Sequence, residues 1–224
     1  NLDTVTAPSL DHTGKPDDQR QAAASILVCP SCRSASLPYS DETMICPACA
    51  TAFPKLGTMR DLRTDRVADT ALELESDDAH HDVTLASAET LFRHYEARLH
   101  NLGPGTKGRA LEIGAGTGNL TLGLAQKAEF SELWITDLSP RFLERLVDRI
   151  GRTGSIERIK PCLLDANALP FLDSSFDVIV GHSVLHHLLD FETTLRETYR
   201  CLRPGGAAMF GDPMMDSHAI VCMI

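Results

Sequence analysis

From residue 87 onward, short apolar runs alternate with segments whose apolar residues recur every three or four positions. The runs predict strands at 110–114, 133–137, 159–165, 176–181 and 207–212. The segments between and beside them predict amphipathic helices at 87–102, 119–128, 139–151 and 190–202. Short apolar strands that alternate with helices are typical of a parallel sheet covered on both faces. We therefore expect an α/β fold with a doubly wound, mainly parallel sheet.

Capping residues and apolar stripes support three of these helices. We expect Ser87, Ser139 and Asp190 at the N-caps, with Pro140 in the first turn of the second of these helices. The buried faces that this spacing predicts are Leu91, Phe92, Tyr95 and Leu99, then Phe142, Leu143, Leu146, Val147 and Ile150, and finally Phe191, Leu195, Tyr199 and Leu202.

The first 86 residues follow a different pattern, which divides the chain. Residues 1–25 are polar and predict a flexible tail, and 26–63 carry two cysteine knuckles around a short hairpin-like stretch. Residues 64–86 are acidic and irregular, as in a linker, and residues 87–224 form the α/β domain. We expect the knuckle segment to be a unit separate from that domain.

Charge and composition exclude some classes of protein. The formal net charge is −10, whereas proteins that grip nucleic acid by its phosphates are usually basic, so RNA is a disfavoured partner. There is no apolar run of about 18 residues and no basic-then-apolar signal pattern. We expect a cytoplasmic protein without a membrane span.

The knuckles, Cys29-Pro-Ser-Cys32 and Cys46-Pro-Ala-Cys49, lie 13 residues apart and offer four thiolates. Four soft ligands in a tetrahedral array select zinc or, less often, iron. A redox pair is disfavoured because two copies lie close together and neither opens a helix after a strand. Four donors leave no open position on the metal, so we expect a structural zinc site in a small ribbon.

A glycine-rich turn carries the main functional signal. Residues 111–118 read LEIGAGTG, a strand that runs into Gly114, Gly116 and Gly118, and the next strand ends at Asp137. Glycines let a ligand lie against the backbone, and the acid can accept both ribose hydroxyls. Dinucleotide sites have a third glycine where Asn119 stands. The pattern favours a nucleoside ligand without a pyrophosphate over NAD, FAD or an empty turn.

Residues 109–213 resemble the class I, Rossmann-like S-adenosylmethionine-dependent methyltransferases, especially the ubiquinone and menaquinone biosynthesis branch. The motifs are LEIGAGTGNLT, ITDLSPRFLERL, DANALPFLDSSFDVIVGHSVLHHL and LRPGG, in that order. The resemblance implies cofactor-binding roles for Glu112, Gly114, Gly116, Gly118, Asp137, Leu138, Asp165, Ala166 and His182. In it the glycines hold the methionine part, Asp137 binds the ribose, Leu138 flanks the adenine, and Asp165, with Ala166 beside it, contacts the adenine amino group.

The loop after the fourth predicted strand is where this resemblance places the methyl donor and the acceptor. Methyl transfer needs mainly alignment, with a base only where the acceptor must lose a proton. His182 is our candidate base; the alternative is that it lines the pocket through its backbone. His186 and His187 are weaker candidates, because such a pair commonly packs at a helix start. Tyr95 either folds over the cofactor or is an ordinary core tyrosine.

The cysteine segment resembles the small zinc-ribbon activators of tRNA and rRNA methyltransferases, with Phe53, Pro54 and Gly57 after its second knuckle. A ribbon fused to a methyltransferase is also similar to the zinc-containing 23S rRNA guanine methyltransferases. Those typically use a histidine as fourth ligand, where Cys49 stands here. We therefore expect methyl transfer to a small molecule, such as a natural-product intermediate. The alternatives are RNA methylation through the ribbon and a non-catalytic cofactor-binding partner.

The predicted strands stop short of the resembling family. Its sheet has seven strands, whereas the sequence predicts five, the last ending near Asp212. We therefore expect the C-terminal strands to be missing and the domain to be incomplete at its C-terminus. We also expect the ribbon's loss to leave cofactor binding intact.

Overall fold

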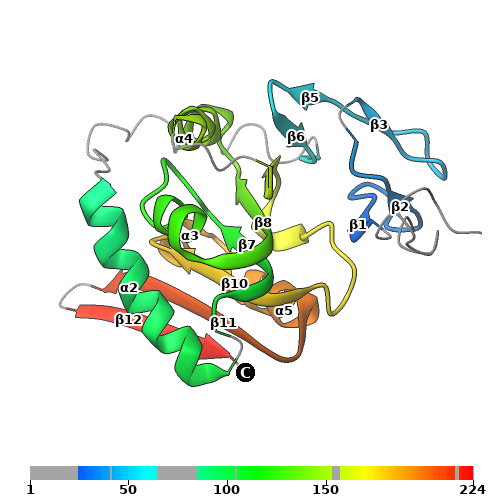
Figure 1. The fold of residues 1–224 in the computed structure, drawn as a ribbon. Helices are drawn as coiled ribbons and strands as arrows, with labels where there is room; N and C mark the ends of the chain where they lie inside the picture. Colours follow the sequence, from blue (N-terminus) through cyan, green and yellow to red (C-terminus); the bar gives the residue numbers. More distant parts are fainter. Residues whose placement is uncertain are drawn as a thin grey trace, which may run out of the picture.

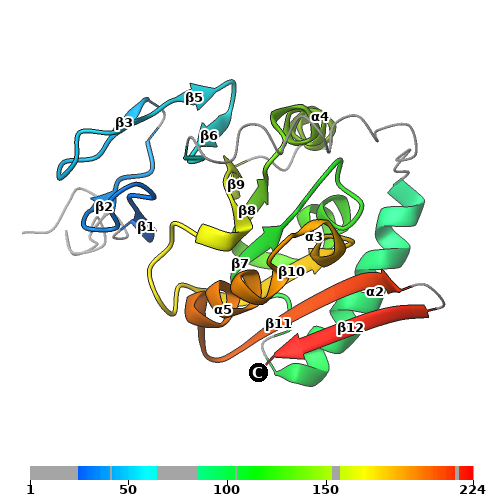
Figure 2. The same cartoon turned by 180° about the vertical axis from the view of Figure 1, so that it is seen from behind.

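A computed structural model describes residues 25–40, 42–64, 85–103, 105–152, 157–214 and 217–223. Its centre is an eight-stranded sheet in the order β12-β11-β10-β7-β8-β9-β6-β5. Helices lie on both sides of the sheet. In Figure 1, α2 and α3 are in front of it, and in Figure 2, seen from behind, α5 is in front of it. The predicted tail falls almost wholly outside the described residues, and so does the predicted linker.

The strands of the sheet are β5 (Lys55–Leu56), β6 (Met59–Asp61), β7 (Lys107–Ile113), β8 (Glu129–Asp137), β9 (Ile159–Leu163), β10 (Phe176–His182), β11 (Leu202–Met214) and β12 (Ser217–Met223). The helices are α2 (Leu85–Leu102), α3 (Thr121–Lys127), α4 (Pro140–Gly151) and α5 (Phe191–Cys201), with the 3₁₀ turns η3 (Ala166–Ala168) and η4 (Leu185–His187). Two small hairpins precede them, β1 (Leu27–Val28) with β2 (Ser36–Leu37) and β3 (Met44–Ile45) with β4 (Ala52–Phe53).

The predicted doubly wound, mainly parallel sheet is confirmed. Strands β7 to β11 pair in parallel with one another, and β7 lies between β8 and β10. The prediction that no strand follows the fifth is wrong for residues 217–223, which form β12 antiparallel to β11 over seven residue pairs. The free edge of β11 supplies the hydrogen bonds that order this segment, and that edge is not visible in the sequence.

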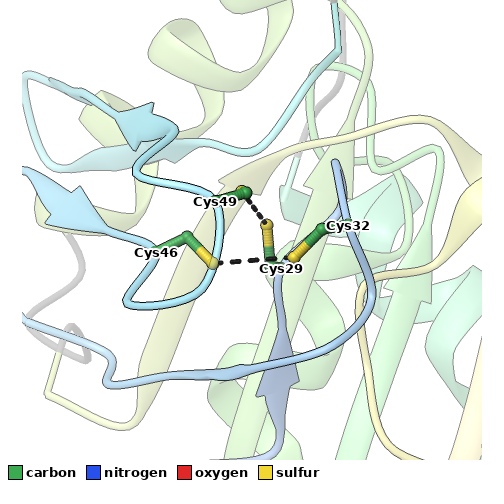
Figure 3. A group of neighbouring side chains, drawn as sticks. All are labelled: Cys29, Cys32, Cys46 and Cys49. Atoms are coloured by element: carbon green, nitrogen blue, oxygen red, sulfur yellow. Dashed lines mark hydrogen bonds between the residues drawn. The ribbon is translucent and has the colours of Figure 1, made fainter.

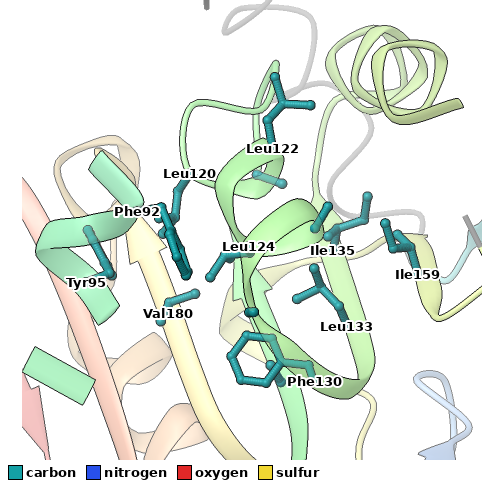
Figure 4. Packing of buried hydrophobic residues seen from close by; sticks show 14 of the residues in the cluster. Phe92, Tyr95, Leu120, Leu122, Leu124, Phe130, Leu133, Ile135, Ile159 and Val180 are labelled. Carbon is teal, nitrogen blue, oxygen red and sulfur yellow. The ribbon is translucent and has the colours of Figure 1, made fainter. Parts of the chain in front are cut away.

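One face of the sheet packs against α2, α3 and α4. Phe92 and Tyr95 of α2 and Leu124 of α3 meet Val180 and Ile135 of the sheet in one buried cluster (Figure 4). These side chains come from amphipathic helices whose apolar stripes lie against apolar strand positions. Because this cluster lies beneath the strand ends, it gives the loops at those ends a rigid base.

The opposite face is covered by α5 and by the cysteine segment. Leu27, Leu37, Met44, Phe53 and Leu62 of that segment share a buried cluster with sheet residues, among them Trp134, Phe176 and Ile179. Phe171 lies edge-on to both Trp134 and Phe176, with ring centroids 5.2 and 4.9 Å apart. The ribbon and α5 thus cover this face of the sheet together.

Backbone pairing also joins the ribbon to the sheet. β6 pairs in parallel with β9, with Arg60 opposite Cys162 and Asp61 opposite Leu163. The Val28 N–H donates to the Pro170 carbonyl at 2.9 Å. The sheet therefore continues across the predicted boundary between residues 63 and 87, which the sequence analysis did not expect.

The helix ends agree with the predicted caps at two of three places. The Ser139 hydroxyl accepts from the Phe142 N–H with Pro140 in the first turn, and the Asp190 carboxylate accepts from the Thr193 N–H. The prediction for Ser87 is wrong, since α2 already begins at Leu85. The stripe predicted for α2 is buried or half-buried, and so is that of α4.

The stripe predicted for α5 is wrong at two positions. Phe191 is 48 % exposed and Tyr199 is 68 % exposed, whereas Thr194, Thr198 and Cys201 are buried. The buried face of α5 is thus formed by these smaller residues, and the Thr194 hydroxyl donates to the Asn167 side chain at 2.7 Å.

Candidate functional site

The candidate site lies where the parallel strands end. From β7 the chain adds β8 and β9 on one side and, later, β10 and β11 on the other, so the strand order reverses between β7 and β10. In open α/β sheets ligands bind outside the carboxyl ends of the strands at such a reversal. The loops there carry Gly114 after β7, Asp137 at the end of β8, Asp165 after β9 and His182 at the end of β10.

The glycine loop turns through three residues in the left-handed region, with φ of +67° at Gly114, +53° at Gly116 and +106° at Gly118. A Cβ on Gly114 would lie 2.3 Å from the Val184 side chain, and one on Gly118 would lie 2.5 Å from Leu146. A Cβ on Gly116 would meet nothing within 4 Å. Gly114 and Gly118 therefore serve close packing, whereas Gly116 faces open space that a ligand can fill.

Asp137 ties the glycine loop to the next helix. Its carboxylate accepts from the Gly116 N–H at 2.7 Å and from the Ser139 N–H at 2.9 Å. The neighbouring Leu138 is half-buried, and its carbonyl accepts from Arg63 Nη1 at 3.3 Å. Since a carboxylate has further lone pairs, Asp137 can still accept hydrogen bonds from a ligand.

Glu112 is a buried acid beneath this loop. It is 1 % exposed, and neither its Oε2 nor the buried Thr121 Oγ1 has a hydrogen-bond partner in the described part of the chain. Burial raises the pKa of Glu112 to about 8; the nearby Thr121 side chain opposes this shift, and the Asp137 charge contributes to it. A buried carboxyl group whose Oε2 has no hydrogen-bond partner, beside an open glycine loop, fits a cationic ligand group, which would supply the missing interaction.

The raised pKa predicts a pH effect on stability. A folded-state pKa above the unfolded value gives stability that is present below about pH 4.5 and is lost as pH rises through about 8. Glu112→Gln removes this ionisation. We therefore expect the ligand-free variant to gain stability over the wild type between pH 5 and pH 8, on the order of 3 kcal/mol.

Urea denaturation of both proteins at the two pH values measures this difference. Glu144→Gln, an exposed acid on α4, is the matched control and should follow the wild type. Equal pH dependence in wild type and Glu112→Gln would contradict the buried-acid interpretation.

Asp165 and Ala166 lie in the loop after β9, at the start of η3. The Asp165 carboxylate caps η3 by accepting from the Asn167 N–H at 2.9 Å, and Ala166 is half-buried. The Leu164 N–H donates to the Asp137 carbonyl at 3.1 Å. The loops after β8 and β9 are therefore held together at this edge of the sheet.

The loop after β10 separates the three candidate histidines. Tyr95 is buried, and its hydroxyl donates to the Gly181 carbonyl at 2.7 Å and lies 3.4 Å from His182 Nδ1. Burial raises the pKa of Tyr95 above its usual range. Tyr95 is thus a core residue that braces this loop. His186 Nδ1 instead lies 2.7 Å from Asp212 Oδ1.

Two residues of this region were not predicted from the sequence. Asp212 lies near the end of β11, and the signal that could have identified it is an acid at the end of an apolar strand. Arg63 follows the ribbon's last strand and holds Asp61 through two hydrogen bonds of 2.9 and 2.7 Å while it contacts Leu138. Nothing in the sequence marks this contact, because it depends on the docking of the ribbon.

The four cysteines form one cluster, whose Sγ atoms all lie within 4.8 Å of one another (Figure 3). Cys29 and Cys49 are 3.7 Å apart, and so are Cys32 and Cys46. The sequence analysis expected the two knuckles on either side of one hairpin. In the structure each knuckle instead forms the turn of its own small hairpin. Four sulfurs at about 2.3 Å from a tetrahedral ion are roughly 3.8 Å apart, so the cluster could hold a metal ion.

The two knuckles repeat one backbone turn. Arg33 and Ala50, each four residues after the first cysteine of its pair, have φ near +59°. The Arg33 N–H donates to the Cys29 carbonyl, and the Ala50 N–H donates to the Cys46 carbonyl, both at 2.9 Å. A repeated turn that presents two sulfurs from each side is typical of a ribbon metal site.

Comparison with known proteins shows which proteins the α/β part of the chain resembles. Residues 111–210 match the model of a family described as "Methyltransferase domain". A ubiquinone/menaquinone biosynthesis C-methyltransferase of Neisseria meningitidis is 32 % identical over 133 residues, which cover 59 % of this chain and 53 % of the relative. A malonyl-[acyl-carrier protein] O-methyltransferase of Halorhodospira halophila is 36 % identical over 102 residues, covering 46 % of this chain and 34 % of the relative.

The fold is also found in a solved structure. A protein of Galdieria sulphuraria assigned as a sarcosine dimethylglycine methyltransferase superposes with a TM-score of 0.52 at 20 % identity, over 65 % of this chain and 60 % of that one. The matched part spans about half the length of the Neisseria relative. The expected Rossmann-like fold is thus confirmed for the α/β part, and residues 111–210 of the chain match a methyltransferase-domain model.

Proposed function

We propose that this protein is an S-adenosylmethionine-dependent methyltransferase that acts on a small molecule. The observation that carries the proposal is the open, positive-φ position of Gly116, held against the Asp137 carboxylate at the end of the next strand. The relatives support it, because one is named for methylation at carbon and another for methylation at oxygen. A natural-product intermediate remains our proposal for the class of acceptor.

We propose that the cofactor lies across the ends of β7, β8 and β9. The glycine loop would take the amino-acid part, with the unpartnered Glu112 oxygen near its ammonium group. Asp137 would accept the ribose hydroxyls, Leu138 would flank the adenine, and Asp165 would bind its amino group. When bound, the cofactor supplies an activated methyl group, and the chain's own contribution is to align that group with the acceptor.

Asp137→Ala tests the ribose contact. A hydrogen bond to a charged group contributes about 1.5–3 kcal/mol, so we expect S-adenosylmethionine to bind about 10- to 150-fold more weakly. Isothermal titration calorimetry measures this change, and Asp148→Ala, an exposed acid on α4, should bind as the wild type does. Equal affinities in both variants would remove Asp137 from the site.

We also propose that Cys29, Cys32, Cys46 and Cys49 bind one structural zinc ion. The support is the 3.7 Å sulfur spacing and the all-thiolate donor set, which suits zinc and leaves no open coordination position. The ion would fix the two hairpin turns and, through them, the apolar residues that the ribbon lays on the sheet.

Labelled methyl transfer tests the proposed function. The wild type is incubated with methyl-labelled S-adenosylmethionine and a panel of small hydroxyl, amine and activated-carbon acceptors, beside a total RNA sample. We expect label in a small molecule. Label in RNA, with tight and steeply salt-dependent RNA binding, would instead favour the rRNA or tRNA methyltransferase alternative. Micromolar cofactor binding without any label transfer would favour the non-catalytic partner.

The charge of the chain supports a small-molecule acceptor over RNA. The formal net charge is −10, so we do not expect a basic surface that binds RNA phosphates and releases their counterions.

Within the described residues, no helix combines the length and the apolar character needed to cross a membrane.

A further inference from the structure

Two side chains of α4 contact the glycine loop. Arg149 is half-buried, and its Nη1 donates to the Thr117 carbonyl at 2.8 Å. Leu146 lies one turn earlier on the helix, and a Cβ on Gly118 would come within 2.5 Å of it. Residues three apart lie on one face of a helix, so α4 meets the loop with one apolar and one cationic side chain.

The glycine loop has little stiffness of its own. Gly114, Gly116 and Gly118 all have positive φ, and a glycine backbone has more accessible conformations than that of any other residue. Ordering such a segment costs conformational entropy. Contacts that already hold the loop in one shape before a ligand arrives therefore strengthen binding.

The bond from Arg149 fixes one peptide unit of this loop. The carbonyl of that unit belongs to Thr117 and accepts from Arg149, while its N–H belongs to Gly118 and donates to the Ala115 carbonyl at 3.0 Å. The unit cannot rotate without losing both bonds, one of them charge-assisted. It follows directly on Gly116, so its orientation shapes the open space that we assign to the amino-acid part of the cofactor.

The helix that carries Arg149 is itself anchored. Its buried residues in the main core are Leu143, Leu146 and Ile150. At its start, the Ser139 N–H donates to the Asp137 carboxylate, which also accepts from the Gly116 N–H. The helix is thus joined to the glycine loop at two places, through Asp137 near its start and through Arg149 in its last turn.

We propose that Arg149 is a positioning residue for the amino-acid part of the cofactor and acts through the Thr117 carbonyl; this rests on the proposed function. Arg149 holds the glycine loop in the shape that leaves the space at Gly116 open. The ribose and the adenine, which we assign to Asp137 and Asp165, do not depend on this bond. Loss of Arg149 should therefore weaken the binding of the amino-acid part selectively.

Calorimetry with two ligands tests this selectivity, because 5′-methylthioadenosine has the adenine, ribose and sulfur of S-adenosylhomocysteine but lacks its amino-acid part. Arg149→Met keeps the aliphatic stem without a donor, so we expect about 10-fold weaker S-adenosylhomocysteine binding and 5′-methylthioadenosine affinity within about twofold of the wild type. Arg149→Lys keeps a donor and should bind S-adenosylhomocysteine more tightly than Arg149→Met. The matched control is Arg152→Met, at an exposed arginine just after α4, which should bind both ligands as the wild type does. Equal weakening of both ligands, or wild-type affinity in Arg149→Met, would overturn the proposal.

Amide hydrogen exchange of the ligand-free protein supplies the second test. The Gly118 amide should be protected in the wild type and exchange about tenfold faster in Arg149→Met, while the Leu143 amide, which donates to the Ser139 carbonyl within α4, keeps its rate. Equal Gly118 rates would overturn the proposal, and so would an unprotected Gly118 amide in the wild type, whether or not the variant folds. Failure of the proposed function would appear separately, as a wild type that binds neither ligand.

Discussion

Gly116→Val should abolish S-adenosylmethionine binding, with a loss of affinity of at least about 100-fold. The valine side chain would enter the open space above residue 116, which is where we place the amino-acid part of the cofactor. It would also occupy a backbone position with φ of +53°, which L side chains rarely adopt. Calorimetric titration of the variant with the cofactor measures the loss.

Backbone strain alone must be separated from the loss of space. Gly57→Val is the matched control, since Gly57 has φ of +59° and also meets nothing within 4 Å, but lies in the turn between β5 and β6. It should show a similar drop in stability and unchanged cofactor affinity. Wild-type affinity in Gly116→Val would place the cofactor elsewhere.

Cys46→Ser should release the metal and weaken the whole domain. The ribbon lays Leu27, Phe53 and Leu62 on the same sheet face as Trp134, so its loosening would expose that face. A loss of about 3 kcal/mol lowers the Tm of a protein of this size by roughly 6–12 °C. Because β6 pairs with β9 and Arg63 contacts Leu138, we also expect about tenfold weaker cofactor binding.

Elemental analysis, thermal denaturation and calorimetry on this variant measure the three effects. Cys201→Ala is the control: this cysteine is buried outside the cluster, so its loss should cost stability but leave the metal in place. The sequence analysis expected cofactor binding to survive loss of the ribbon, whereas the shared core leads us to predict weaker binding. Metal loss with unchanged Tm and affinity would restore the view of two independent units.

The elements of the fold that could be predicted are those with local signals. Two examples are the strand, glycine turn and helix at 111–121 and the start of α4 at Ser139 and Pro140. In both, the signal lies in residues next to one another in the sequence. The face of α5 could not be predicted, because the apolar spacing pointed to Phe191 and Tyr199, whereas the helix turns Thr194 and Thr198 toward the sheet. β12 and the pairing of β6 depend on free strand edges, which appear only once the sheet is formed.

The candidate site divides in the same way. Residues that follow a strand end, such as Gly116, Asp137 and Asp165, could be named because chain order places all parallel strand ends at one edge. The bond between His186 and Asp212 joins residues 26 positions apart, and sequence offers no sign of it.

The crystal structure of the wild-type chain with S-adenosylhomocysteine tests the central claim most directly. We predict the homocysteine part above Gly116, the ribose hydroxyls within hydrogen-bond distance of Asp137, and the adenine between Leu138 and Asp165. Density for the ligand at any other place, or a glycine loop left empty at saturating ligand, would contradict the account.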